Sequence, residues 1–327
     1  MRGAFFKTLT ALADADPRIN LVVGDLGFGV VEPFAKRFPD RFLNVGVAEQ
    51  NMTGVAVGMA LCGKVVFTYS IANFPTLRCL EQIRNDACYH NANVKVVAVG
   101  GGLAYGALGM THHATEDLAI MRSLPGMAVV APGDPREAEA ATRAIASHPG
   151  PCYLRLGRAG EPVVHPGPID FTLGQALTVR EGRDLTLIST GGMLETAVKV
   201  ADDLAKDRLQ ARLLSMHTVK PLDEGAVLRA ATETRAVFTL EEHSVLGGLG
   251  SAVAEILAES GELPRPFKRL ALPSAFAAHV GSQEFLRKQY GLSAESIAAE
   301  IRKVMTLARA GHVRRRASTQ RGPRAAS

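Results

Sequence analysis

FLNVGVAEQNMTGVAVGMALC, residues 42–62, joins a short apolar strand to a long helix of small residues. The strand is expected at Phe42–Gly46 and the helix at Glu49–Cys62. Glu49 opens this helix, and a carboxylate in an otherwise buried segment has to be paired, hydrogen-bonded or protonated. The helix dipole alone would also favour an acid here, by about 0.3–1 kcal/mol. Position alone therefore leaves a functional and a structural interpretation of Glu49 open.

The same unit of strand, loop and helix recurs along the first half of the chain. Strands are expected at residues 20–25, 42–46, 65–70, 94–100, 127–131 and 152–157. Helices are expected at residues 49–62, 76–89, 116–124 and 135–147. Nearly continuous apolar strands that alternate with helices predict a parallel sheet covered on both faces.

A proline-rich connector at residues 161–173 separates this first domain, residues 1–160, from a second one at residues 174–310. In the second domain, expected strands at 185–189, 211–216, 236–241 and 269–272 alternate with helices at 194–206, 224–232, 251–259 and 294–308. The predicted fold class is α/β, with two consecutive domains that each hold a mostly parallel sheet with helices on both faces. Residues 311–327 are expected to form a disordered basic tail.

Composition limits the classes of partner. The 327 residues are 47% hydrophobic and 21% charged, as in globular chains with room for two domains. The formal charge of +5 resides in the tail, which has five arginines and no acid, so the remainder gives no sign of a nucleic-acid partner. No apolar segment predicts a membrane helix or a secretory signal. Four cysteines without metal-ligand spacing are typical of reduced thiols, and we expect a cytoplasmic protein with no membrane partner.

Two glycine-rich segments are similar to nucleotide-binding motifs but do not fit them. GMALCGKV, residues 58–65, ends in Val65 rather than Ser or Thr, and it follows a helix where the phosphate-binding loop follows a strand. GGLG, residues 247–250, lacks the third glycine of the dinucleotide fingerprint, since Val253 stands there. A helix end and a tight strand-to-helix turn explain these segments better, which disfavours an NAD-binding enzyme.

A loop with five glycines, residues 100–109, follows a strand and leads into Thr111-His112-His113. Ligands gather at the carboxyl ends of parallel strands, and glycine lets the backbone approach them closely. The two histidines could donate hydrogen bonds or move protons near neutral pH, although one could simply cap the next helix. They make a poor metal pair, because adjacent residues rarely face the same way, and we predict no metal site on this chain.

Aromatic and basic side chains follow other strands of the same sheet. Tyr69 and Phe74 come at and after the end of one strand, where they could stack on a flat heterocycle or pack in the core. Arg155 and Arg158 end the last strand of the first domain, which suits a phosphate or carboxylate, with a salt bridge as the alternative.

Together these residues resemble the transketolase family of thiamine diphosphate enzymes, over about residues 25–308. GVAEQNM, residues 46–52, looks like the family's pyrimidine-domain signature, and GMTHH, residues 109–113, is similar to its Gly-x-Thr-His-Gln segment. Residues 127–135 are similar to the segment that follows, which ends in Ala-Pro-Gly-Asp-Pro, and EEHSVLGGLG, residues 241–250, is similar to part of the C-terminal domain.

The resemblance implies roles for individual residues. Glu49 would hydrogen-bond N1′ of the aminopyrimidine and so drive the 4′-amino group to the imino form that deprotonates the thiazolium carbon. Phe74 would stack on the pyrimidine, and Asp25 would lie near the thiazolium. The other candidates are Tyr69 for cofactor contact, His112 for donor oxygens and catalysis, Arg158 for a substrate phosphate, and His113 and Leu108 for substrate contact.

The chain shows no Gly-Asp-Gly…Asn motif, which holds magnesium in full-length members of the family. The resemblance thus implies the beta subunit of a split transketolase that transfers a two-carbon ketol or acyl unit between sugar-type substrates. A partner alpha subunit with the diphosphate-binding domain would hold thiamine diphosphate and Mg²⁺, and an α2β2 heterotetramer is expected. Alone, this chain should be unable to hold the cofactor.

One position departs from the family pattern. Ala107-Leu108 stand where an aspartate usually contacts a donor hydroxyl. Because an unpaired buried polar group costs about 1–3 kcal/mol, leucine predicts a donor or acceptor other than the standard pentose phosphates, such as a deoxy sugar. Two alternatives stay open: the beta subunit of a pyruvate-type 2-oxo-acid decarboxylase, which usually has His-Ser-Gln at 111–113, and a scaffolding subunit without activity.

Overall fold

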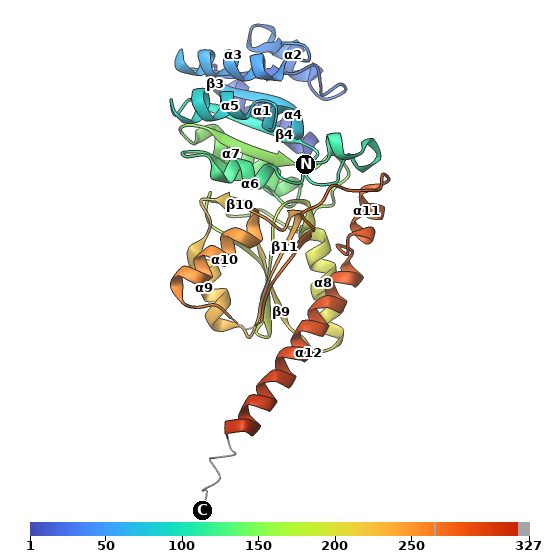
Figure 1. The fold of residues 1–327 in the computed structure, drawn as a ribbon. Coiled ribbons are helices and arrows are strands. Elements are labelled where there is room, and N and C mark those ends of the chain that lie inside the picture. The colour runs from blue at the N-terminus through green and yellow to red at the C-terminus, as the bar shows by residue number, and fades with distance from the viewer. Residues whose placement is uncertain (265, 320–327) are drawn as a thin grey trace, which may run out of the picture.

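Two α/β domains follow one another along the chain, each built on its own sheet (Figure 1). The structure, a computed structural model, describes residues 1–264 and 266–319, with side chains up to residue 308. Helices cover both faces of each sheet, and the first domain stacks on one end of the second. The predicted fold class is therefore confirmed.

The first sheet has the strand order β10-β5-β6-β4-β3-β1-β2. Six parallel strands come from the first domain: β1 (Ile19–Val23), β2 (Phe42–Asn44), β3 (Val65–Ile71), β4 (Val94–Val99), β5 (Ala128–Val130) and β6 (Cys152–Leu156). All residues of β1 and β3–β6 are buried, as their continuous apolar runs require, whereas β2 lies at the edge.

The seventh strand of this sheet comes from the second domain. β10 (Thr218–Lys220) pairs antiparallel with β5 and places Thr218 opposite Val130. The sequence did not predict it, because three residues carry almost no periodicity. This strand ties the two domains together through main-chain hydrogen bonds.

Helices enclose the first sheet from both sides. One face packs against α1 (Arg2–Ala15), α2 (Glu32–Arg37) and α7 (Pro135–Ser147), and the other against α3 (Glu49–Leu61) and α6 (Asp117–Ser123). The helix predicted at residues 76–89 is instead broken into α4 (Asn73–Thr76), α5 (Leu80–Gln82) and a π-helical turn, η2 (Ile83–Cys88). α7 starts as expected, with Pro135 in its first turn and the Asp134 carboxylate accepting from the Glu137 amide.

The second sheet has the order β12-β11-β8-β9-β7. Its parallel strands are β8 (Leu185–Ser189), β9 (Ala211–Ser215), β11 (Val237–Ser244) and β12 (Phe267–Leu272); β7 (Leu177–Arg180), which was not predicted, is antiparallel. α8 (Leu194–Lys206) and α12 (Ala294–Thr319) cover one face, and α9 (Glu224–Glu233) and α10 (Leu249–Ser260) cover the other (Figure 1). The short α11 (Gln283–Gln289) precedes α12.

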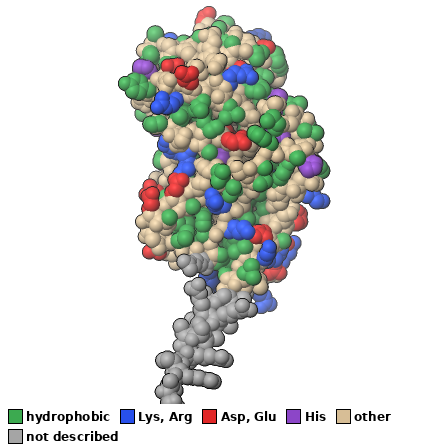
Figure 2. Space-filling view, viewed as in Figure 1, with side chains coloured by type: hydrophobic (Ala, Val, Ile, Leu, Met, Phe, Trp, Pro, Cys, Tyr) green, Lys and Arg blue, Asp and Glu red, His purple; other side chains and the backbone are tan. Residues whose placement is uncertain are grey.

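The C-terminal helix is longer than expected. α12 runs to Thr319 rather than ending at Ala308, so residues 311–319 of the predicted disordered tail are helical, and residues 320–327 lie outside the described part of the chain. Acidic and basic side chains of the described residues are interspersed on the face shown in Figure 2. Among the described helices, none is long and apolar enough to cross a membrane.

Candidate functional site

Glu49 begins a row of side-chain contacts at the carboxyl edge of the first sheet. Its Oε2 accepts a hydrogen bond from Nη1 of Arg78 at 2.5 Å. The guanidinium carbon of Arg78 lies 5.0 Å from the centroid of the Phe74 ring. The ring of His112 then meets Phe74 edge-on, with 5.2 Å between the centroids.

Tyr105 extends this row to Arg158. Its ring centroid lies 6.4 Å from that of His112, and the guanidinium carbon of Arg158 lies 5.2 Å from the Tyr105 ring. The structure thus brings four of the predicted residues into one row, whose members in spatial order are Glu49, Arg78, Phe74, His112, Tyr105 and Arg158. Arg78 and Tyr105 were not predicted as site residues.

Topology explains why distant segments meet here. Glu49 follows β2, Phe74 follows β3, His112 follows β4 and Arg158 follows β6. Because these strands are parallel, the segments after them emerge at the same edge of the sheet. The sheet therefore assembles the row from positions that span more than 100 residues of sequence.

Glu49 is buried but only partly satisfied. Its side chain is 1% exposed, and its Oε1 atom has no hydrogen-bond partner among the described residues. Gly24, at the end of β1, lies so close that a Cβ there would come within 3.2 Å of the Glu49 Cγ. A buried carboxylate oxygen without a donor is costly, so this atom is suited to an incoming hydrogen-bonding group.

The neighbouring thiol offers no competing chemistry. Burial raises the pKa of Cys79 to about 11. The negative charge of Glu49 raises this pKa further, whereas a hydrogen bond with Thr53 lowers it. Cys79 is therefore protonated at neutral pH. Because only the thiolate form of cysteine is a nucleophile, this side chain is unreactive.

Asn73 fixes the segment that carries His112. Its Nδ2 atom donates to the carbonyl oxygen of Thr111 at 3.3 Å and also to that of His113. His112 Nδ1 lies 3.0 Å from the hydroxyl oxygen of Thr111. The half-buried ring of His112 lies between two aromatic neighbours, Phe74 and Tyr105. His113 points inward, with Nε2 3.4 Å from the carbonyl oxygen of Gly106.

A cleft of about 340 Å³ opens beside this row, and both domains line it. The first domain contributes Asn73, Phe74, Arg78, Thr111 and His113, and the second contributes Leu272, Phe276 and Tyr290 among others. The cleft can admit a molecule of cofactor or sugar size.

Asp25, Leu108 and Tyr69 lie outside the row. Asp25 has a left-handed backbone (φ 54°), and its carboxylate accepts from the side-chain amide of Asn44 at 2.9 Å. Leu108 is 56% exposed on a short 3₁₀ turn, η3 (Gly106–Leu108). Tyr69 is 1% exposed and packs against Phe5 and Phe6, so we assign it to the core rather than to cofactor binding.

Arg155 is engaged in the domain junction, as the salt-bridge alternative predicts. Its Nε donates to Asp117 at 2.7 Å, and its Nη2 donates to the carbonyl oxygens of Ala114 and Glu242. Asp117 also accepts from the Tyr153 hydroxyl at 2.6 Å. Arg155 is thus not available to an external anion.

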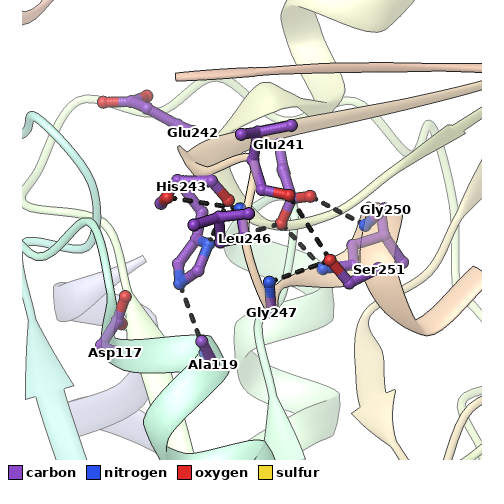
Figure 3. Close-up of polar contacts among 12 residues, drawn as sticks. Asp117, Ala119, Glu241, Glu242, His243, Leu246, Gly247, Gly250 and Ser251 are labelled. Carbon is purple, nitrogen blue, oxygen red and sulfur yellow. Dashed lines mark hydrogen bonds and ion pairs between the residues drawn. The ribbon is translucent and has the colours of Figure 1, made fainter. Parts of the chain in front are cut away.

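Consecutive residues of β11 complete the junction. Figure 3 shows Glu241 turned toward the start of α10 and Glu242 pointing the opposite way, as alternation along a strand requires. Glu241 accepts from the amides of Leu249 and Gly250 at 2.7 and 2.8 Å. His243 Nε2 accepts from the amide of Ala119 in the first domain at 3.3 Å (Figure 3).

Glu242 connects three segments. Oε1 accepts from the Leu103 amide at 2.6 Å and from Gln283 at 2.9 Å, and Oε2 accepts from Arg287 Nε at 2.6 Å. Leu103 belongs to the glycine loop that leads to His112, while Gln283 and Arg287 belong to α11. The second domain therefore holds the loop of the first in place.

The residues also limit what the site can bind. In the part of the chain that the structure describes, no group of three or more His, Cys, Asp or Glu side chains could hold a metal ion. What the row offers is a buried acid, an aromatic face, a histidine and an arginine. These groups can hold a flat heterocycle and an anionic, oxygen-rich substrate.

Comparison with protein families assigns both domains. Residues 1–161 match the family described as the transketolase pyrimidine binding domain, and residues 174–297 match the transketolase C-terminal domain.

Curated relatives match over nearly their full length. A subunit of the apulose-4-phosphate transketolase of Phocaeicola vulgatus is 40% identical over 298 residues, which cover 90% of this chain and 94% of that protein. The 6-deoxy-6-sulfo-D-fructose transketolase subunit SqwH of a Clostridium species is 41% identical over 298 residues, which cover 91% of this chain and 92% of that protein.

Solved structures agree with these matches. A split-gene transketolase, described as an inactive beta4 tetramer, superposes with a TM-score of 0.84 at 39% identity and covers 94% of this chain and 98% of that one. A transketolase from Pichia stipitis shares the fold, with a TM-score of 0.79 at 20% identity over 46% of its length. The chain therefore belongs to the transketolase family and contains the family's pyrimidine-binding domain followed by its C-terminal domain.

Proposed function

We propose that this chain is the beta subunit of a two-component, thiamine-diphosphate-dependent transketolase that transfers a two-carbon ketol or acyl unit between sugar-type substrates. The observation that carries the proposal is Oε1 of buried Glu49, which has no hydrogen-bond partner among the described residues. Through Arg78, Glu49 joins the row of Phe74 and His112, and a cleft lined by both domains opens beside this row. The near full-length likeness to subunits of other split transketolases supports it.

The residues present fit the cofactor. Bound thiamine diphosphate supplies a carbon that, once deprotonated, takes up and releases a carbonyl fragment. Glu49 exchanges a proton with N1′ of the aminopyrimidine, for which its unpartnered oxygen is available. Phe74 offers its ring to the flat heterocycle, and Asp25 stands at the same sheet edge.

The other residues of the row act on the substrate. His112 donates hydrogen bonds to donor oxygens and can move a proton near neutral pH. Arg158 offers a planar fork of N–H donors to a terminal phosphate or sulfonate. His113 shapes the loop from within, and Leu108 presents an apolar side chain where a hydroxyl-binding acid is usual.

The partner completes the site in this proposal. An alpha subunit would hold the diphosphate and Mg²⁺, and two copies of each chain would form an α2β2 heterotetramer in the cytoplasm. The split-gene relative described as inactive contains beta chains alone, which supports the need for a second subunit.

Leu108 and the relatives point to a specialised substrate. The two relatives are named for apulose 4-phosphate and 6-deoxy-6-sulfo-D-fructose, neither of which is a standard pentose phosphate donor. We infer a ketose with a terminal anionic group as the donor. Kinetics with xylulose 5-phosphate and ribose 5-phosphate as the best pair would contradict this choice.

Co-expression with an alpha-type subunit tests the proposal. Thiamine diphosphate binding is measured by isothermal titration calorimetry, with and without Mg²⁺, for this chain alone and for the complex. We expect binding by the complex only. Tight binding by the chain alone would overturn the division of the site between the two chains, and a complex that binds no thiamine diphosphate would overturn the cofactor assignment.

A further inference from the structure

The guanidinium of Arg78 lies between the two residues proposed to hold the cofactor's aminopyrimidine. One N–H reaches Glu49 Oε2 at 2.5 Å, and the guanidinium carbon lies 5.0 Å from the centre of the Phe74 ring. Arg78 also lines the cleft at the domain junction. The side chain thus contacts an acid and an aromatic face at the same time.

These are the contacts that an aminopyrimidine would make. A guanidinium is flat, delocalised and rich in N–H donors, and it packs readily on aromatic rings. An aminopyrimidine is also flat, carries an amino group and hydrogen-bonds a carboxyl group through a ring nitrogen. Arg78 and the heterocycle therefore compete for the same acid and the same ring.

The ion pair between Arg78 and Glu49 can open. The Arg78 side chain is 45% exposed, whereas Glu49 is 1% exposed and keeps one oxygen unpartnered among the described residues. An arginine with this exposure regains water when it leaves, and an incoming heterocycle then supplies the hydrogen bond that buried Glu49 needs, so the exchange leaves no buried acid unpaired. The cleft beside it gives the side chain room to move.

We propose that Arg78 is a displaceable occupant of the aminopyrimidine site. It pairs with Glu49 while the chain is without cofactor, and it leaves when the heterocycle binds. It thereby keeps Glu49 compensated during folding and assembly, at the expense of cofactor affinity. This inference rests on the proposed function, because it concerns the same acid and the same ring.

The test compares variants in the complex with the alpha-type subunit. Arg78→Met removes the guanidinium and keeps a flexible apolar side chain, and Arg78→Lys keeps the charge without the flat surface. Arg84→Met is the matched control, since Arg84 is an exposed arginine six residues further on that pairs only with Asn85 among the described residues. Thiamine diphosphate affinity is measured by calorimetry, association by stopped-flow fluorescence, and melting temperature confirms folding.

We expect Arg78→Met to bind thiamine diphosphate about twofold to fivefold more tightly and to associate faster, because the heterocycle no longer has to displace the guanidinium. Arg78→Lys should fall between Arg78→Met and the wild type, and Arg84→Met should match the wild type. Affinity that is unchanged or weaker in Arg78→Met would overturn the inference and leave the proposed function standing. A wild-type complex that binds no thiamine diphosphate would overturn both.

Discussion

Two buried glutamates of this chain have opposite surroundings. Glu242, at the domain junction, accepts hydrogen bonds from a main-chain amide, an amide side chain and an arginine, so both of its oxygens are used. Glu49, at the carboxyl edge of the first sheet, has one arginine that is itself 45% exposed, and one oxygen without a donor among the described residues. Their exposures, 3% and 1%, are nearly the same.

The difference separates a structural acid from the acid that we propose binds the cofactor. Burying an ion is costly unless its hydrogen-bonding capacity is met, and folding meets it for Glu242 with three donors from two separate segments. Glu49 has one hydrogen-bonded oxygen and one without a donor among the described residues, which favours the binding of an external donor. Hydrogen-bond saturation, more than burial, distinguishes the two roles.

The largest expected effect follows from replacing the unsaturated acid. Glu49→Gln keeps the shape but cannot exchange the proton, so the assembled enzyme should lose about 10²–10⁴-fold in kcat, the usual contribution of general acid–base catalysis. Steady-state kinetics measure the loss, and size-exclusion chromatography checks that assembly is retained. Glu81→Gln, an exposed acid on a neighbouring helix, is the control. Normal turnover by Glu49→Gln would remove this residue from the mechanism.

Replacing Glu242, whose two oxygens are both hydrogen-bonded, should lower the free energy of unfolding instead. Glu242→Gln keeps an acceptor for Leu103 but leaves Arg287, 17% exposed, without its counter-charge, which should cost about 3 kcal/mol of unfolding free energy. Urea unfolding measures this cost. Glu139→Gln removes an exposed pair with Arg143 on α7 and should cost no more than about 0.5 kcal/mol. If Glu242→Gln were as stable as the wild type but failed to bind cofactor, the distinction between the two acids would fail.

A third buried acid, Glu137, predicts how stability depends on pH. Glu137 accepts from His165 in the connector at 2.7 Å and from the Gly133 amide at 2.6 Å, so it belongs to the saturated class. Burial lowers the pKa of His165, but the hydrogen bond and charge of Glu137, with the charge of Asp134, outweigh it and raise the pKa above 6.5.

Because the folded pKa of His165 is raised, its stabilisation is fully present below about pH 6.5 and is lost as the pH rises through the folded value. His165→Gln should therefore lower the unfolding free energy by about 1.5–3 kcal/mol at pH 6 and by less at pH 9. Urea unfolding at a series of pH values measures the difference, with exposed His90→Gln as control. A loss that grows with pH would mean that His165 is neutral in the folded protein.

The sequence anticipated the parallel strands because each is a continuous apolar run with a helix after it. It missed β7 and β10, which are three or four residues long and are defined by antiparallel partners, in one case across the domain junction. Pairing of this kind depends on tertiary contacts and leaves little local pattern.

The meeting of Glu49, Phe74, His112 and Arg158 in one row was equally predictable, because each follows a parallel strand; their roles in a site stay predictions. The place of Tyr69 was not predictable, because every residue of β3 is buried and alternation then no longer tells which face a side chain occupies. Arg78 could have been found from its spacing, because it stands four residues after Phe74, in the turn that continues α4, and this spacing places both on one side. Its contact with Glu49 depends on the packing of α3 beside this segment and needs the structure.

The smallest expected effect concerns Leu108, which is 56% exposed and takes no part in either acid's surroundings. Leu108→Asp should change the unfolding free energy by no more than about 0.5 kcal/mol, as exposed substitutions do. It restores an acceptor for a donor hydroxyl, worth about 1 kcal/mol, so kcat/KM for a hydroxylated pentose phosphate donor should rise about fivefold relative to a deoxy donor. Ala107→Asp, one residue earlier on the same turn, is the matched control and should not change the ratio. An equal change in both variants would show that added negative charge, rather than a hydroxyl contact at residue 108, sets the preference.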